Sequence, residues 1–397
     1  MKKTLLAAAL LAGFAGAASA QSSVTLYGIL DAGLVYKNVK YSNGPVDLND
    51  SNFGMAYGTQ SGNRLGFKGV EDMGNGNRLT FQLENGFDIG NGTAGQGSRL
   101  FGRQAWFGVE NDAWGYARMG RQLNFASDYF GALDPFSQGF AQANIGSVFG
   151  STNTYRLSNA LKYQTPNMGG FTAGVMYSFA TGIDSLYPGN GVNVSSGTGY
   201  AYQTTNNSRQ ISLGAKYANG PIYVAASYDK LYGASGIAGG SPDASPSEWN
   251  LGGSYDFNVV KVNAVYGQTR GGWMGGQNNQ GNSGAAISIP GVNGGTGVFG
   301  NGTNIYDANW GVNSYQIGLT APIGGASKVF ASWNMATPNG NMQEAYNATN
   351  MTSYNLGYSY DFTKRTNMYA YVSYANNYAT IDGLKSTVLG VGLRHQF

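Results

Sequence analysis

Residues 24–34 read V-T-L-Y-G-I-L-D-A-G-L and alternate, residue by residue, between two faces of an extended chain. Leu26 and Leu34 share one face, whereas Tyr27 and Asp31 share the other. A period of two residues indicates a β-strand rather than a helix. Because one face is apolar and the other is wetter, this strand suits a position between lipid and a water-filled interior.

The same alternation recurs along the whole chain. Further segments with this period are residues 78–84, 156–164, 211–217, 222–228, 259–266, 315–320, 329–333, 354–360 and 368–374. The sequence therefore predicts an all-β fold.

The connections between these segments alternate between two lengths. The tight polar or glycine-containing turns are residues 74–77, 111–115, 167–170, 219–221 and 363–365. The long connections, rich in Gly, Asn and Ser, are residues 181–207, 233–246, 271–309 and 338–349. Strict alternation places all tight turns at one end of an up-and-down sheet, as in a transmembrane β-barrel. Counting strand pairs in this way gives about sixteen antiparallel strands, enough to enclose an aqueous channel.

The N-terminus has the three parts of a secretory signal peptide. Lys2 and Lys3 precede an apolar stretch over residues 5–17, and A-S-A follows at residues 18–20. That order favours cleavage after Ala20. We therefore expect residues 1–20 to be a signal peptide and residues 21–397 to form one barrel domain.

The composition excludes several classes of protein. Charged residues make up 11% of the 397 residues and Cys is absent, so a disulfide scaffold and thiolate metal sites are excluded. The formal net charge is +3, and the sequence contains no basic cluster of the kind that binds nucleic acid. After Ala20 no apolar run approaches the roughly 20 residues of a transmembrane helix.

Two alternatives to a channel fit the sequence less well. A secreted β-sandwich or adhesin would show charged residues on its solvent face, whereas the non-apolar face here is mainly Gly, Ser, Thr, Asn and Tyr. A barrel hydrolase needs a Ser-His site, but the only histidine is His395, with outward parity and two residues before Phe397. We therefore expect no catalytic site, no cofactor and no metal site.

The end of the chain separates the membrane barrel from the soluble alternatives. The last eleven residues, T-V-L-G-V-G-L-R-H-Q-F, place Leu389, Val391 and Leu393 on one face and end on Phe397. A final amphipathic strand with a terminal aromatic residue is what the barrel-assembly machinery of the outer membrane recognises. We therefore expect that machinery to be a partner.

Five blocks of sequence carry a family resemblance. They are Q-S-S-V-T-L-Y-G at residues 21–28, N-R-L-G-F-K-G-V-E-D-M-G-N-G at 63–76, Y-A-R-M-G-R-Q at 116–122, N-A-L-K-Y-Q-T-P-N-M-G-G-F at 159–171 and G-L-R-H-Q-F at 392–397. In this order and spacing the chain resembles the general trimeric porins of β-proteobacteria, over almost its whole mature length.

The resemblance implies a sixteen-stranded trimeric barrel in the Gram-negative outer membrane, surrounded by lipid and lipopolysaccharide. It implies passive diffusion of ions and small hydrophilic solutes. It also implies that the third long loop, residues 123–155, folds into the lumen and narrows it. The alternative within transport is a solute-specific channel.

The resemblance also implies residues of the constriction. On the barrel wall these are Arg64 and Arg156, with Arg118 as a further inward candidate, and on the loop they are Asp128 and Asp134. Arg103 is in phase with outward residues, so a bulge or a place above the membrane would be needed to bring it inward. Because arginines outnumber carboxylates among these candidates, we expect a mild preference for anions.

Overall fold

The computed structural model describes residues 23–43, 46–179, 209–232, 245–272, 287–289, 297–299 and 308–397. The expected signal peptide and most of the long connections 181–207, 233–246 and 271–309 lie outside these residues.

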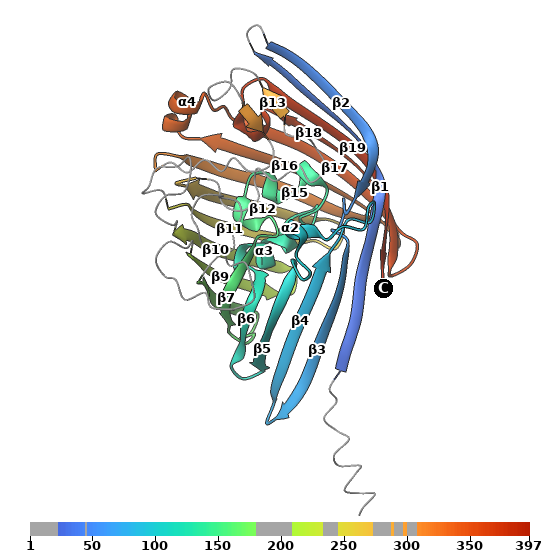
Figure 1. The fold of residues 1–397 in the computed structure, drawn as a ribbon, viewed down its shortest axis with the longest axis vertical. Helices are drawn as coiled ribbons and strands as arrows, with labels where there is room; N and C mark the ends of the chain where they lie inside the picture. Colours follow the sequence, from blue (N-terminus) through green and yellow to red (C-terminus); the bar gives the residue numbers. More distant parts are fainter. Residues whose placement is uncertain are drawn as a thin grey trace, which may run out of the picture.

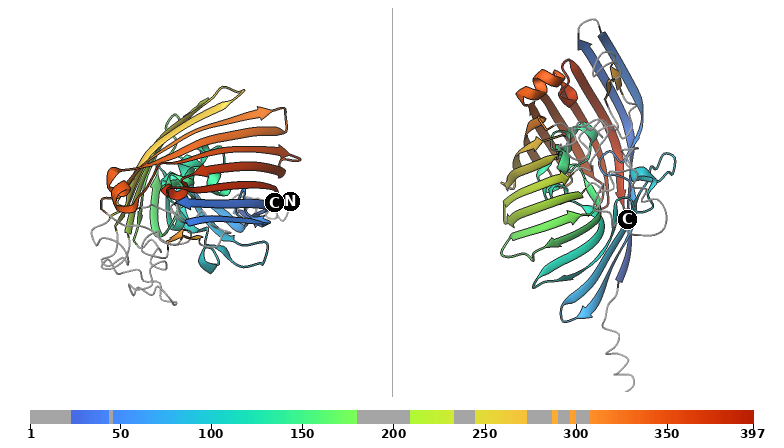
Figure 2. Two further views of the ribbon diagram at one scale, coloured as in Figure 1. Left: turned by 90° about the horizontal axis from the view of Figure 1, so that it is seen from above. Right: turned by 60° about the vertical axis from the view of Figure 1, so that its left-hand side comes forward.

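The described chain forms a closed antiparallel barrel (Figures 1 and 2). Its strands are β1 (Ser23–Asn43), β2 (Val46–Tyr57), β3 (Arg64–Gly74), β4 (Asn77–Gly86), β5 (Gln104–Asn111), β6 (Gly115–Leu123), β7 (Arg156–Gln164), β8 (Phe171–Ser178), β9 (Arg209–Asn219), β10 (Ile222–Tyr232), β11 (Ser247–Asp256), β12 (Lys261–Arg270), β15 (Gly311–Ile323), β16 (Ser327–Pro338), β17 (Met351–Asp361), β18 (Thr366–Asn376) and β19 (Leu384–Gln396). A separate two-stranded sheet contains β13 (Ile287–Ile289) and β14 (Gly297–Phe299).

The barrel closes where β1 pairs with β19 along thirteen residue pairs, from Ile29–Gln396 to Tyr41–Leu384. On its other edge β1 pairs with β3 through its first part and with β2 through its second part. The seventeen strands of the sheet therefore occupy sixteen positions around the ring, because β2 and β3 share one position. The prediction of a sixteen-stranded antiparallel barrel is confirmed.

The two ends of the barrel differ as the connection lengths predict. Turns of only a few residues join β3 to β4, β5 to β6, β9 to β10, β11 to β12, β15 to β16 and β17 to β18, at the end where β1 begins and β19 finishes. We call this the turn end, and the opposite end, which carries the long connections, the loop end. The hairpin of β1 and β2 projects past the neighbouring strands at the loop end (Figure 1).

The strands alternate between an outward apolar face and an inward polar or small face. On β19 the outward Leu389, Val391 and Leu393 are about half exposed, whereas the inward Ser386 and Val388 are buried. A barrel in water would hide such leucines. In a membrane the same residues face hydrocarbon, so their exposure is favourable. Among the described residues, no helix is long and apolar enough to cross a membrane.

The buried core lies inside the barrel and is formed by the connection between β6 and β7. This connection holds α3 (Phe125–Phe130) and four short 3-10 turns, and its aromatic side chains from Phe125 to Phe149 are almost completely buried. Phe125 packs on the wall of β8 and β9, where Gly174 and Gly214 leave room; a Cβ atom on Gly214 would lie 2.5 Å from Cβ of Phe125. Two other short helices, α2 (Gly95–Ser98) and α4 (Gly340–Tyr346), lie in connections at the loop end.

A second aromatic cluster holds the far side of the same connection. Phe136 and Phe140 meet Phe330 of β16 and Tyr369 and Tyr371 of β18, with ring centroids 4.9–5.5 Å apart. Edge-to-face contacts of this kind add to the area that the rings bury. The connection is thus packed against both sides of the inner wall.

Candidate pore constriction

Residues 124–155, which we call the constriction loop, are attached to the inner wall by hydrogen bonds. Asn124 caps α3 by accepting from Ser127 N, and its side-chain Nδ2 donates to Asp229 Oδ1 of β10 at 3.1 Å. Ser151 donates from its hydroxyl to Glu248 Oε1 of β11 at 2.7 Å. Two inward carboxylates of the wall therefore hold the start and the end of the loop.

The middle of the loop reaches the opposite part of the ring. Gln142 accepts from the Ser386 hydroxyl of β19 at 2.6 Å and donates to Ser373 of β18 at 3.0 Å. Phe140 N donates to the carbonyl of Thr59, in the short segment between β2 and β3. The loop therefore contacts the inner wall on the β9–β11 side and on the β18–β19 side. β6 ends at Leu123 and β7 begins at Arg156, so the connection covers residues 124–155, one residue shorter than the expected 123–155.

The part of the wall that the loop leaves uncovered carries arginines around one carboxylate. On β4, Glu84 accepts from Arg103 Nε at 2.6 Å, and its second oxygen lies 4.0 Å from Arg64 of β3. The hydroxyl of Tyr27 also donates to Glu84, at 2.9 Å. Arg103 lies just before β5 begins at Gln104, so strand alternation does not govern it. This is why Arg103 points inward although its parity is outward.

Arg121 and Arg156 extend this group toward β6 and β7. The charges of Arg103, Glu84, Arg121 and Arg64 all act on the Arg156 guanidinium, which donates to the Thr154 carbonyl at 2.9 Å. Arg121 donates to the Gly102 carbonyl at 2.7 Å and to the Ser158 hydroxyl at 2.8 Å. In the described part of the chain, neither Arg121 nor Arg156 forms an ion pair with a carboxylate.

A β-bulge corrects one prediction about this region. Gly120 pairs with Ala160, but Gln122 pairs with Leu157, so one residue of β6, Arg121, opposes two residues of β7. The extra residue is accommodated at Asn159, whose φ is +49°. Alternation predicts an outward Leu157, and this is wrong, because Leu157 is fully buried in the core that contains Phe125.

The two acids expected on the constriction loop do not face the arginines. Asp134 accepts from the backbone N–H groups of Phe136, Gln138 and Ile145 at 2.8–3.1 Å, so its carboxylate fastens the loop to itself. Burial raises the pKa of Asp134 to about 6. Asp128 forms an ion pair with Lys162 of β7. Both carboxylates are therefore bound to other groups, and neither Asp128 nor Asp134 pairs with the arginines of the wall.

Arg118 lies inward but toward the turn end. Its guanidinium stacks over the rings of Tyr116 and Trp106, at 3.9 and 4.2 Å from the centroids, and lies 3.5 Å from Glu110. These contacts separate Arg118 from the group around Glu84.

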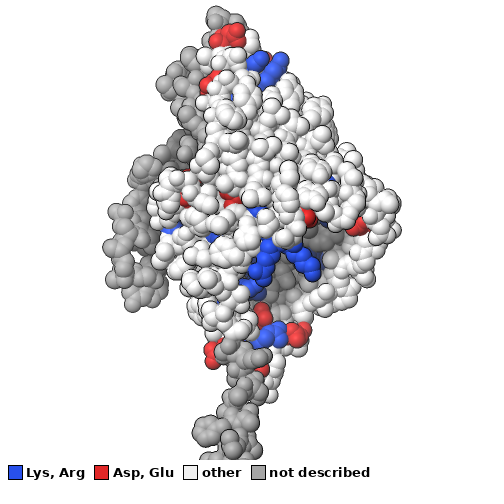
Figure 3. Space-filling view, turned by 90° about the vertical axis from the view of Figure 1, so that its right-hand side faces the viewer, with Lys and Arg blue, Asp and Glu red and all other residues white. Residues whose placement is uncertain are grey.

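The structure thus brings Arg64 and Arg156 together and keeps Arg118, Asp128 and Asp134 apart from them. It adds Arg103, which alternation assigns outward, and Glu84 and Arg121, which sequence reasoning did not place at the constriction. Alternation assigns Arg121 outward, and its contacts with Gly102 and Ser158 are visible only in the folded structure. Figure 3 shows Lys and Arg side chains around a hollow on the face that it presents.

Comparisons with known proteins agree with this architecture. The profile of the family described as Gram-negative porin matches residues 7–380. An outer membrane porin protein of Bordetella pertussis is 46% identical, and outer membrane porin protein 32 of Delftia acidovorans is 29% identical, each over 100% of both chains.

Solved structures show the same fold. An anion-selective porin from Comamonas acidovorans has a TM-score of 0.65 at 24% identity, covering 95% of this chain and 100% of that one. OmpT of Vibrio cholerae, solved in a trimer form, has a TM-score of 0.57 at 14% identity, covering 95% of this chain and 99% of that one. Family and fold are those of a channel rather than an enzyme. The chain belongs to the Gram-negative porin family and is an outer-membrane porin.

Proposed function

We propose that solutes pass between the constriction loop and the wall that bears Arg64, Arg103, Arg121 and Arg156, and that this passage prefers anions. The observation that carries the proposal is the charge balance of the wall: Arg64 and Arg103 flank the carboxylate of Glu84, and the charges of Arg64, Arg103, Arg121 and Glu84 act on Arg156. Arg64 and Arg156 thereby keep their proposed role at the constriction, whereas Arg118 is proposed to act on ions nearer the turn end.

The expected preference is mild. A unit charge acts on an ion about 10 Å away through water with about 0.4 kcal/mol, which changes the local ion concentration about twofold. The net excess of three positive charges in the described group therefore favours anions severalfold without binding them tightly. A wet lumen also screens these charges as the salt concentration rises.

The experiment that tests this proposal is the reversal potential of single channels in a planar bilayer with a potassium chloride gradient. We expect a potential of the sign given by chloride permeation, which shrinks at high salt. Cation preference would contradict the charge assignment, and a channel without conductance would contradict the pore itself.

We propose further that the protein assembles as a homotrimer through the wall formed by β1, β2 and β19. Leu34 pairs with Met55 and with Val391, and all three side chains point outward and are at least 45% exposed. Phe53, in the next outward row of β2, is 72% exposed. A contiguous apolar patch beside the projecting hairpin suits a contact between copies. Sedimentation of the detergent-solubilised protein tests this, with Met55→Lys expected to shift the mass toward one protomer.

We also propose how the chain is processed, what inserts it into the membrane and which lipids surround it. A signal peptidase removes residues 1–20, which mass spectrometry of the purified protein checks directly. The barrel-assembly machinery binds the β19 segment that ends at Phe397, whose backbone exchanges two hydrogen bonds of 3.1 Å with Gly28. Outer-membrane lipid and lipopolysaccharide contact the outward apolar face.

A further inference from the structure

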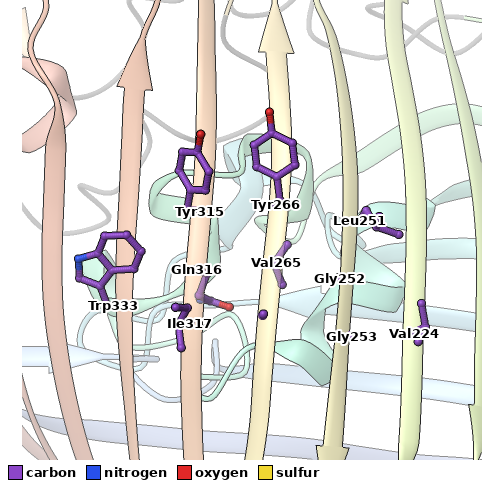
Figure 4. A pocket seen from close by; sticks show the side chains of 11 residues that line it. Val224, Leu251, Gly252, Gly253, Val265, Tyr266, Tyr315, Gln316, Ile317 and Trp333 are labelled. Carbon is purple, nitrogen blue, oxygen red and sulfur yellow. The ribbon is translucent and has the colours of Figure 1, made fainter.

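The outer surface of the barrel carries an apolar groove across five strands. One outward cross-strand row runs from Val224 through Gly253, Ala264 and Ile317 to Trp333. Because Gly253 and Ala264 have almost no side chain, the row is hollow in the middle. The hollow has a volume of about 560 Å³ and an almost entirely apolar lining (Figure 4).

Aromatic rings border this groove on the side of the loop end. Leu251, Tyr266 and Tyr315 form the adjacent outward row. The rings of Tyr266 and Tyr315 lie 5.1 Å apart, and their hydroxyl groups point the same way (Figure 4). Tyr266 and Tyr315 therefore form an aromatic rim between the groove and the loop end of the barrel.

Three cations lie on the same outward face beyond the aromatic row. Lys230 belongs to the outward series of β10 that includes Val224 and ends at Tyr232, and Arg270 ends the series of β12 that includes Ala264. Both pair with Ser247 of β11. Their neighbours Asp229 and Thr269 point inward and bind the loop Asn124 and the wall Glu248, respectively.

Arg209 joins these two cations from the first position of β9, where it pairs with Tyr232 of β10. Within the described ranges, none of Arg209, Lys230 and Arg270 forms an ion pair with a carboxylate. Nζ of Lys230 lies 5.2 Å from the centroid of the Tyr232 ring.

The spacing between the cations and the groove matches one membrane leaflet. Lys230 follows Val224 by six residues, and Arg270 follows Ala264 by six residues. Six residues of strand span about 20 Å. A strand tilt of about 40° leaves about 15 Å along the membrane normal. That is about half of a hydrocarbon core of roughly 30 Å.

We propose that this wall is a binding site for the lipid A portion of lipopolysaccharide, with one phosphate at Lys230, a second phosphate at Arg270 and one acyl chain in the groove over Gly253 and Ala264. The inference deepens the lipopolysaccharide contact proposed above and is independent of the anion preference of the lumen. Three features of the wall favour lipid A as its ligand. The cations lie at the loop end, which faces the outer leaflet. Lys230 and Arg270 stand two strands apart, about 10 Å, so two phosphates on one headgroup can each meet a cation. The site also lies across the ring from β1 and β19, the wall proposed for contact between copies.

Native mass spectrometry of the detergent-solubilised full protein, titrated with purified lipid A, tests this site. Each cation near an anionic lipid is worth about 1 kcal/mol, or about fivefold in affinity, so Lys230→Ala/Arg270→Ala should weaken binding about 25-fold. Ala264→Leu fills the groove from an exposed position, and excluding even one methylene from it should weaken binding about fourfold.

The matched control is Lys40→Ala/Lys385→Ala. These two lysines pair across β1 and β19 at the same end of the barrel, on a wall without this groove. We expect wild-type binding of lipid A by this control, and weaker binding of a phosphatidylglycerol, which has one phosphate, by the wild type.

Three results would overturn the site: binding of lipid A that neither test variant weakens, equal weakening in the control, or phosphatidylglycerol binding as tight as that of lipid A. Single-channel conductance of the same preparations separates the two proposals. A conducting wild type that binds no lipid A refutes the lipid site alone, whereas a wild type without conductance refutes the pore.

Discussion

Nε of Arg103 lies 2.6 Å from Oε1 of Glu84, and this ion pair holds the guanidinium of Arg103 in the lumen although strand parity would place it outside. The same carboxylate lies 4.0 Å from Arg64. Glu84 therefore offsets part of the positive charge of the constriction, while Arg121 and Arg156 remain without a carboxylate among the described residues. The first two predictions below follow from this distribution of positive and negative charge.

Replacing Glu84 by glutamine should increase anion preference. The Glu84→Gln variant keeps the shape of the side chain but removes the one negative charge of the group, so the anion-to-cation permeability ratio should rise about two- to fourfold. Reversal potentials in a salt gradient measure this ratio. Glu110→Gln, near Arg118 and the turn end, is the matched control and should change it less. An unchanged or lower ratio in Glu84→Gln would place Glu84 away from the ion path.

Removing Arg121 or Arg156 should have the opposite effect. Each of Arg121→Ala and Arg156→Ala takes one uncompensated charge from the lumen, so anion preference should fall about two- to fourfold, and the double variant should lose most of it. The same reversal-potential measurement applies. Lys385→Ala, on the outward face of β19, controls for charge that does not line the lumen. If this control lowers the ratio as much as Arg156→Ala, the assignment is wrong.

Removing the contacts that hold the start of the constriction loop should make the single-channel current more variable. In Asn124→Ala, α3 loses its cap, worth about 1 kcal/mol, and Asp229 loses one of its hydrogen-bond donors, which costs about 1–3 kcal/mol. We expect larger and more variable single-channel currents and a lower midpoint of thermal unfolding. Asn339→Ala, which removes the corresponding cap of α4 outside the lumen, should leave the currents unchanged. Wild-type currents in Asn124→Ala would show that this contact does not position the loop.

A side chain at Gly214 should displace the loop from the wall. A Cβ atom there would lie 2.5 Å from Cβ of Phe125 and 2.8 Å from the Tyr129 ring, both in α3. Gly214→Val should therefore shift α3 and change the conductance, with barrel formation checked by circular dichroism. Gly54→Val on the exposed β2, where a Cβ atom meets nothing within 4 Å, is the control. Equal conductance in both variants would contradict the docking of Phe125 over Gly214.

The sequence predicts the barrel well because a barrel wall is a repeating local pattern. Alternation along each strand and the two lengths of connection report the fold without any long-range information, and Leu389, Val391 and Leu393 do face outward as expected. The wall position of Arg64 follows from the same rule.

The constriction is predicted less completely because its contacts depart from that rule. Arg103 lies outside a strand, and the bulge at Asn159 changes the phase of β7. Asp134 is a loop acid by sequence, yet it binds three backbone N–H groups of its own loop, which only the folded conformation reveals. By sequence, an inward acid such as Glu248 cannot be distinguished from any other residue of the lumen wall, because its contact with Ser151 of the loop exists only in the folded protein.

The most direct test of the pore path uses the absence of cysteine from the chain. In Arg156→Cys, the new thiol should react with a water-soluble methanethiosulfonate reagent added during single-channel recording, and a bulky reagent should reduce the current. In Leu161→Cys, on the outward face of the same strand, the reagent should leave the current unchanged. A full current after verified modification of Arg156→Cys would contradict a constriction between the loop and the arginine wall.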